Sequence, residues 1–97
     1  MAKKMAKKFY KFVIEELNGD QEHSYPMGCW ANTENVAIKK ARAYAKQFYD
    51  NYDGRPKEIE SNVFLFESVG IEVQLDFDGE YDFELFKKEL AERATIQ

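Results

Sequence analysis

The clearest pattern of hydrophobic and polar positions lies between residues 71 and 78. Apolar and polar residues alternate strictly there, and the segment reads IEVQLDFD. Successive side chains of a strand point to opposite faces, so this pattern predicts a strand with one buried and one solvated face. The predicted buried face consists of Ile71, Val73, Leu75 and Phe77.

Two further strands are predicted near the N-terminus. Residues 9–17 read FYKFVIEEL, and their apolar side chains fall on both faces, which is typical of a well-buried strand. Asn18-Gly19 follows and predicts a tight hairpin of type I′ leading to a return strand over 22–31. Because Pro26 has no N–H group, we expect this return strand to lie at a sheet edge or to carry a bulge.

A helix is predicted after Asn32 or Thr33, either of which can accept hydrogen bonds from the first N–H groups. It extends to about Tyr52, and DGRP at 53–56 ends it. The inward positions recur at helical spacing. They are Ile38, Ala41, Ala45, Phe48 and Tyr52.

The second half of the chain predicts another strand-strand-helix unit. A strand over 59–68 is centred on the apolar run VFLF, Gly70 supports a turn, and the alternating strand follows. A turn at Asp78-Gly79 and a final helix over 82–93 complete the unit, with Asp78 or Asp82 as the cap. The inward side chains of that helix are Phe83, Phe86 and Leu90. An alternative is a short fifth strand starting at Tyr81, but the segment FELFKKELAER has helical periodicity.

The predicted fold class is therefore α+β with the order ββαββα. We expect a four-stranded, mainly antiparallel sheet with both helices packed on one face. Ninety-seven residues suit one domain, here 9–97, and the start MAKKMAKK (residues 1–8) reads as a basic, flexible tail. No segment is long and apolar enough to span a membrane, and the single cysteine favours a reducing, cytoplasmic setting.

Charge is distributed unevenly along the chain. Residues 1–49 hold nine Lys or Arg and five Asp or Glu, a net +4, whereas residues 50–97 hold five and thirteen, a net −8. These sum to the formal net charge of −4. An asymmetry of this kind concerns partners and solubility, and it also allows self-association through complementary faces, so we include a homo-oligomer among the expectations.

Candidate chemistry is sparse. The segment LDFDGEYDFELF, residues 75–86, has the look of a calcium loop, but placing Gly79 at the invariant glycine puts Gln74 and Leu85 at the two end ligands. His23 and Cys29 are six residues apart on one predicted strand, about 20 Å when extended, so they form no catalytic pair. The sequence contains no phosphate-binding or zinc motif. We therefore expect no metal, no cofactor and no catalytic residue.

The acidic half offers the sharper binding hypothesis. Carboxylates on one strand face and in the following turn imitate a row of phosphates and suit a basic groove on a protein partner. Small inhibitors encoded by phages and mobile elements bind their targets in this way. The analogy concerns the kind of surface and is not a match in sequence. The alternative is that the acids only keep an aromatic-rich domain soluble. The candidate residues are Glu72, Asp76, Asp78, Glu80, Asp82 and Glu84.

The second hypothesis is a nucleic-acid-binding or antitoxin-like regulatory module that uses the first helix. Its basic stripe comprises Lys39, Lys40, Arg42 and Lys46, and the alternative is an ordinary solvated helix face. The segment PMGCWANTENVAIKKARAYA, residues 26–45, resembles the strand-to-helix segment of HicB-type antitoxins. Val36-Ala37 stands where that family tends to carry Glu-Ala, and the flanking segments do not match. The resemblance covers about a fifth of the chain and does not assign it to the family.

Overall fold

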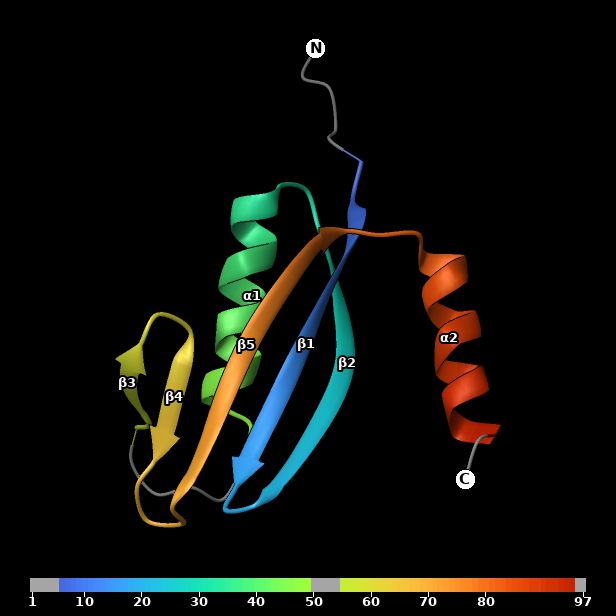
Figure 1. Ribbon diagram of the computed structural model, residues 1–97. Helices are drawn as coiled ribbons and strands as arrows, with labels where there is room; N and C mark the ends of the chain where they lie inside the picture. The colour runs from blue at the N-terminus through green and yellow to red at the C-terminus, as the bar shows by residue number, and fades with distance from the viewer. Residues whose placement is uncertain (1–5, 50–54, 96–97) are drawn as a thin grey trace.

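The computed structural model describes residues 6–49 and 55–95, which form a five-stranded sheet and two helices (Figure 1). The elements in chain order are β1 (Lys8–Asn18), β2 (Gln21–Ala31), α1 (Glu34–Lys46), β3 (Lys57–Glu60), β4 (Val63–Phe66), β5 (Ile71–Glu80) and α2 (Phe83–Thr95). Of the predicted N-terminal tail, residues 1–5 lie outside the described residues, and Lys8 already belongs to β1. Neither helix in the described part of the chain has the length and apolar character needed to cross a membrane.

The sheet order is β2-β1-β5-β4-β3, and each neighbouring pair is antiparallel. The predicted α+β class and antiparallel pairing are therefore confirmed. Pro26 lies on β2, which is an edge strand as its missing N–H group predicted. On the outer side of β2, Arg93 donates to the carbonyl of Ser24 and Lys40 to that of Trp30. On an antiparallel strand, the backbone N–H and C=O groups of alternate residues point to the same side. Those of Ser24 and Trp30 point away from β1, and Pro26 has the same alternation, so the proline removes no hydrogen bond from the ladder with β1.

The prediction of four strands in the order ββαββα is wrong, because the segment 59–68 forms part of a hairpin and not one strand. β3 and β4 pair with each other, and Asn62 in their connection has φ +63. Asparagine tolerates this left-handed conformation better than most residues, so the chain reverses there. The carboxylate of Glu58 accepts the Asn62 N–H at 3.0 Å and stabilises the reversal.

The two predicted turns differ from the structure in detail. The β1–β2 hairpin exists, but its central pair is Gly19-Asp20 because Asn18 already pairs with Gln21. Gly19 alone has positive φ, which fits a type II′ turn and not the predicted type I′. No turn forms at Asp78-Gly79. Instead β5 continues to Glu80 through a β-bulge opposite β1, where Gly79 takes φ +104.

Helix α1 packs on one face of the sheet through Ala37, Ala41 and Ala45, all fully buried. Their small side chains let the helix approach the large buried residues of the strands, which include Phe12, Phe64 and Phe66. Thr33 caps the start of the helix by accepting from the N–H of Val36 at 3.3 Å.

The predicted end of this helix at Tyr52 is wrong. The helix ends at Lys46, because Phe48 and Tyr49 leave the helical path to pack on the rings of Tyr25 and Phe66. Tyr52 and the predicted stop signal at 53–54 lie outside the described residues.

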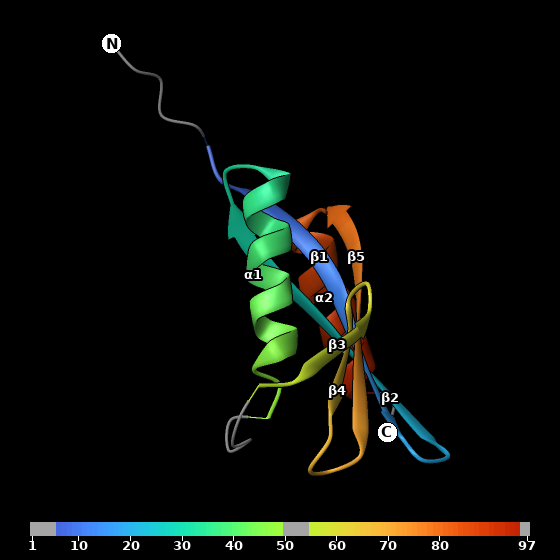
Figure 2. The ribbon, with the colours of Figure 1, turned by 90° about the vertical axis from the view of Figure 1, so that its left-hand side faces the viewer.

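The two helices lie on opposite faces of the sheet, which corrects the prediction that both pack on one face. Along β1, Phe12 stacks on Tyr44 of α1, whereas Phe9 contacts Phe83 and Phe86 of α2. Residues of odd and even number on a strand point to opposite faces, so these contacts separate the helices. Figure 2 shows α1 standing on its own side of the sheet, and Figure 1 shows β1 and β2 between α1 and α2.

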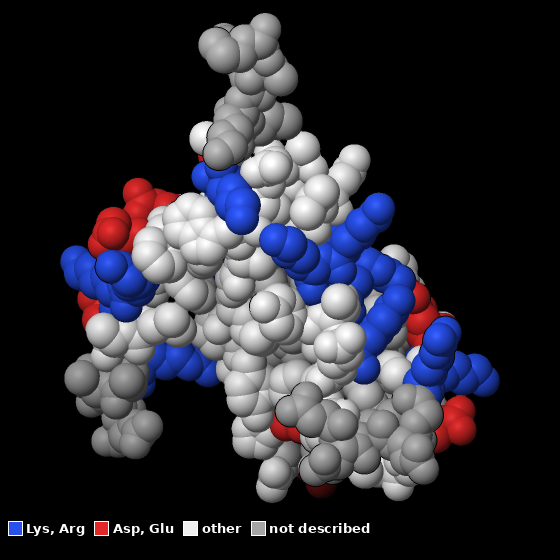
Figure 3. All heavy atoms as spheres, turned by 180° about the vertical axis from the view of Figure 1, so that it is seen from behind, with Lys and Arg blue, Asp and Glu red and all other residues white. Residues whose placement is uncertain are grey.

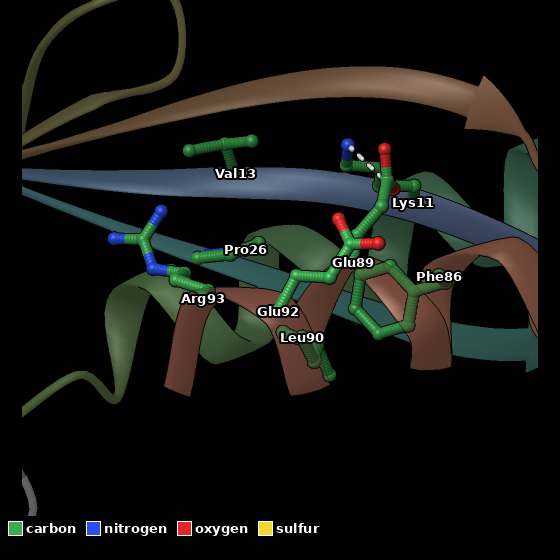
Figure 4. A pocket seen from close by; sticks show the side chains of 8 residues that line it. All are labelled: Lys11, Val13, Pro26, Phe86, Glu89, Leu90, Glu92 and Arg93. Atoms are coloured by element: carbon green, nitrogen blue, oxygen red, sulfur yellow. Dashed lines mark ion pairs between the residues drawn. The ribbon is translucent and has the colours of Figure 1, made fainter. Parts of the chain in front are cut away.

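The apolar packing of helix α2 on the sheet is concentrated at its N-terminal end. Asp82 caps it by accepting from the N–H of Leu85 at 2.9 Å, and Phe86 is buried against Phe9. Towards its C-terminal end Leu90 remains 38% exposed, although the sequence pattern predicted it to point inward. A cavity of about 380 Å³ lies between the helix and the sheet (Figure 4). Lys11 and Glu89 line it and form an ion pair, with Nζ and Oε1 3.8 Å apart.

Candidate functional site

The face of the sheet opposite α1 carries a set of carboxylates near the β1–β2 turn. On β5, Glu72 and Asp76 lie on this face, since the residues between them, Val73 and Leu75, are buried under α1. The strand register places Leu17 of β1 directly between Glu72 of β5 and Glu22 of β2. Residues paired in this way share a face, so acids from β5 and β2 project on either side of Leu17.

The next row of the sheet adds a fourth carboxylate. Glu15 lies between Ser24 of β2 and Gln74 of β5, one row from both Leu17 and Val13. Diagonal neighbours on a sheet are about 7–8 Å apart, so Glu15 lies within reach of the carboxylates in the adjoining rows. We call Glu15, Glu22, Glu72 and Asp76 the acidic sheet patch.

The carboxylates of the acidic sheet patch repel one another. Partial burial raises the pKa of Glu15, and the nearby carboxylates of Asp76 and Glu22 raise it further. Asp76 accepts one hydrogen bond from the side-chain amide of Gln74 at 3.3 Å. Within the described part of the chain, none of the four patch carboxylates forms an ion pair. The patch is therefore a concentration of uncompensated negative charge.

A hollow of about 580 Å³ adjoins this patch at the turn end of the sheet. Its described lining is Leu17, Gly19, Asp20, Glu22, Gly70 and Glu72. An apolar leucine surrounded by carboxylates offers both a surface for a methylene chain and acceptors for a cation. Lysine and arginine side chains combine these two features, so the hollow suits such a side chain.

Four of the six acids predicted from the sequence do not join the patch. Asp78 is exposed beside Tyr81, and Glu80 lies 3.7 Å from the ammonium group of Lys8. Asp82 is occupied as the cap of α2, and Glu84 pairs with Lys87 at 3.2 Å. The structure thus brings together only Glu72 and Asp76 of the predicted set.

Sequence reasoning missed the other two members of the patch. Glu15 and Glu22 lie in the N-terminal half, whose net charge is positive, so they were not grouped with the acidic half. A signal for them exists in the hairpin, because pairing about the β1–β2 turn puts Glu15 and Glu22 on the same face within two rows. Their proximity to β5 could not be read from the sequence, since it depends on the strand order.

The predicted basic stripe on α1 is only partly available. The Arg42 guanidinium donates to both carboxylate oxygens of Glu58, at 3.0 and 2.7 Å, and to the side chain of Asn62. This contact, with the Asn62 N–H, lowers the pKa of Glu58 to about 2. Lys39 and Lys46 are exposed, and Figure 3 shows lysines and arginines gathered over the α1 face.

The two candidates for nucleophilic chemistry remain far apart. His23 and Cys29 lie on the continuous strand β2, and Cys29 is buried with its Sγ directed at the carbonyl of Ala37. Burial raises the pKa of this thiol more than the nearby Lys40 ammonium lowers it. Among the described residues, no group of three or more His, Cys, Asp or Glu side chains is placed to hold a metal ion.

The chain matches no protein-family model, no curated protein and no solved structure.

Proposed function

We propose that this protein is a non-catalytic accessory protein that binds a basic macromolecular partner through the acidic sheet patch. The observation that carries the proposal is the placement of Glu15 on one face of the sheet within diagonal reach of Asp76 and Glu22; partial burial and then these two carboxylates raise the pKa of Glu15. Clustered like charges without counter-charges destabilise an isolated domain, and such perturbed groups concentrate at functional sites. A partner that supplies lysine or arginine side chains relieves this repulsion.

The shape of the surface supports a protein with a basic groove as that partner. Three sheet rows present carboxylates at the spacings of neighbouring and diagonal strand positions, on a rigid antiparallel sheet. The adjoining hollow around Leu17 fits one long cationic side chain. A nucleic-acid mimic of the kind that mobile elements encode would use such a surface to occupy the groove of a nucleic-acid-handling protein in the cytoplasm.

The test is a charge reversal within the patch. The variant Glu72→Lys/Asp76→Lys changes the net charge from −4 by +4, to 0. Capture experiments from the native cells, with wild type and variant as bait, should recover a basic protein with wild type only. Binding of the identified partner to wild type should weaken steeply as salt increases.

A matched control separates patch chemistry from overall charge. Glu60→Lys/Glu84→Lys changes the net charge by the same amount at exposed positions outside the patch and should retain the partner. The patch reversal should also leave thermal stability unchanged or raise it, because it removes like-charge repulsion. If the patch variant folds and binds the partner as tightly as wild type, the proposal is wrong.

A second candidate function is a nucleic-acid-binding or antitoxin-like module that uses the α1 face. The observation that favours it is the collection of basic side chains over α1 on the face away from the acidic sheet patch (Figure 3). Arg42 contributes little because Glu58 and Asn62 occupy its donors. A filter-binding assay with RNA and DNA at low salt discriminates, since a protein that acts only through the acidic sheet patch should retain neither.

A further inference from the structure

A groove follows the outer edge of β2 where α1 crosses it. Its volume is about 600 Å³, within the range of small-ligand sites. Lys7 and Trp30 line it from the sheet side, and Lys40, Tyr44 and Gln47 line it from α1. The described residues that line it include no carboxylate. The groove therefore combines aromatic side chains with cations.

The two aromatic side chains of the groove are held in place yet remain accessible. The Trp30 ring packs against Phe9 and Phe83 on the α2 side of the β2 edge, with centroids 5.3 and 5.1 Å away, and Trp30 is 43% exposed. Tyr44 stacks on Phe12 at 5.9 Å on the α1 side of that edge and is 50% exposed. Large half-exposed rings fixed by buried neighbours provide flat surfaces at little cost in side-chain entropy.

The cations lie beside these rings. The Lys40 Nζ donates to the backbone carbonyl oxygen of Trp30 at 2.6 Å, so its charge lies at the outer edge of β2. Lys7 lines the same groove, and the exposed Lys39 and Lys46 continue the positive charge along α1. Phosphate groups are complementary to this arrangement, whereas the acidic sheet patch, which reaches β2 at Glu22 near the other end of the strand, would repel them.

We propose that this groove binds single-stranded nucleic acid by stacking unpaired bases on Trp30 and Tyr44 and holding the phosphates with Lys7 and Lys40. Single-strand binding proteins combine these two components, a cationic track and aromatic platforms. The proposal goes beyond the acidic sheet patch and does not depend on it. It gives the second candidate function a defined site, which shares Lys40 with the predicted stripe of Lys39, Lys40, Arg42 and Lys46 and adds Lys7, Trp30 and Tyr44.

The single tryptophan of the chain makes the test direct. An oligothymidylate of roughly 10 nucleotides, within the site sizes of small single-strand binders, is titrated into the full chain while tryptophan fluorescence is followed. Stacking of a base on Trp30 should quench the emission saturably, and binding should weaken as salt increases. A duplex of the same length should bind more weakly, because its bases are not free to stack.

Two variants separate the roles within the groove. For single strands, log K falls with log salt by about 0.7 per phosphate contact, so Lys7→Gln/Lys40→Gln should lower that slope by about 1.4. Tyr44→Ala should weaken binding by about 5-fold or more without changing the slope, since a stacked base contributes affinity but no counterion release. Circular dichroism melts establish that each variant is folded.

The control variant Lys57→Gln/Lys88→Gln removes the same charge at exposed positions away from the groove and should bind like wild type. Glu72→Lys/Asp76→Lys should bind at least as tightly as wild type, so a failure here is distinct from a failure of the acidic sheet patch. The proposal is overturned if folded wild type shows no saturable quenching at low salt, or if the control variant loses as much affinity as the groove variant. Equal quenching by an oligoglutamate peptide would also overturn it, because the site would then recognise acidic peptide and not bases.

Discussion

Replacing Gly28 by alanine should destabilise the protein, contrary to the usual effect of removing a glycine from a strand. Gly28 lies on β2, and a Cβ atom built there would stand 2.1 Å from Cζ and 2.5 Å from Cε1 of Phe9. The Phe9 ring cannot easily move aside, because the rings of Trp30, Phe83 and Phe86 surround it at 5.0–5.3 Å. The ring therefore lies directly on the glycine.

The magnitude follows from two opposing contributions. Forcing an extra carbon into a packed site costs about 1–3 kcal/mol. Removing the conformational freedom of a strand glycine stabilises by about 0.5–1 kcal/mol. We expect a net destabilisation of about 1–2 kcal/mol, which lowers the melting temperature of a domain this size by about 5–15 °C. The sign of the stability change tests the reasoning, because replacing an unobstructed strand glycine by alanine would give a small stabilisation.

The assay is urea unfolding followed by Trp30 fluorescence, with Phe9→Leu as the partner in a double-mutant cycle. Shortening Phe9 removes the atoms nearest the new Cβ, so Gly28→Ala should cost at least about 1 kcal/mol less in that background. Ser24→Ala, an exposed substitution on the same strand, should change stability by less than about 0.5 kcal/mol. The reasoning is refuted if Gly28→Ala is as stable as Ser24→Ala, or if Phe9→Leu gives no rescue.

Two further predictions concern single polar contacts. The lowered pKa of Glu58, about 2 against an ordinary 4.5, means that its contact with Arg42 stabilises fully above about pH 4.5 and is lost as the pH falls towards 2. The difference in melting temperature between wild type and Glu58→Gln should therefore shrink over that range, and a difference independent of pH would contradict the prediction. Asp82→Ala removes the acceptor for the Leu85 N–H and should cost about 1 kcal/mol, whereas Asp82→Asn should lose less; equal losses would count against capping.

Much of the local structure could be predicted because it depends on neighbours in the chain. The alternation from Ile71 to Asp78 produced β5 with its inner face buried, and the alanines at helical spacing produced the packed face of α1. The proline in β2 indicated an edge strand, as found. These patterns repeat every two to four residues, so they can be recognised without knowing how distant parts of the chain pack.

The split of 59–68 into β3 and β4 was missed because VFLF dominated the pattern. A left-handed Asn62 and its bond to Glu58 reverse the chain, and neither is visible in hydrophobic periodicity. Similarly, Asp78-Gly79 reads as a turn by composition, yet pairing with β1 turns it into a bulge. Long-range pairing overrode a local preference in both places.

The candidate site was predictable only in part. Glu72 and Asp76 could be placed on one strand face, but Asp82 and Glu84 serve α2 and its surface. Glu15 and Glu22 reach the same face only because β1 lies between β2 and β5. The groove at Trp30 and Tyr44 likewise forms where α1 crosses the sheet edge, a meeting of segments that no spacing along the chain encodes.

The sequence by itself determined the N-terminal hairpin, the alternating strand β5, the presence of both helices, and the apolar faces of β5 and α1. It even held a signal for the arrangement of the helices, since FYKFVIEEL is apolar on both faces and a strand buried on both sides needs cover on both. The tertiary structure alone decided where that cover comes from: α1 on the face of Phe12, and α2 on the face of Phe9. The physical reason is that strand order and helix placement minimise exposed apolar area over the whole molecule, and the positions of the acidic sheet patch and the aromatic groove follow from that global packing.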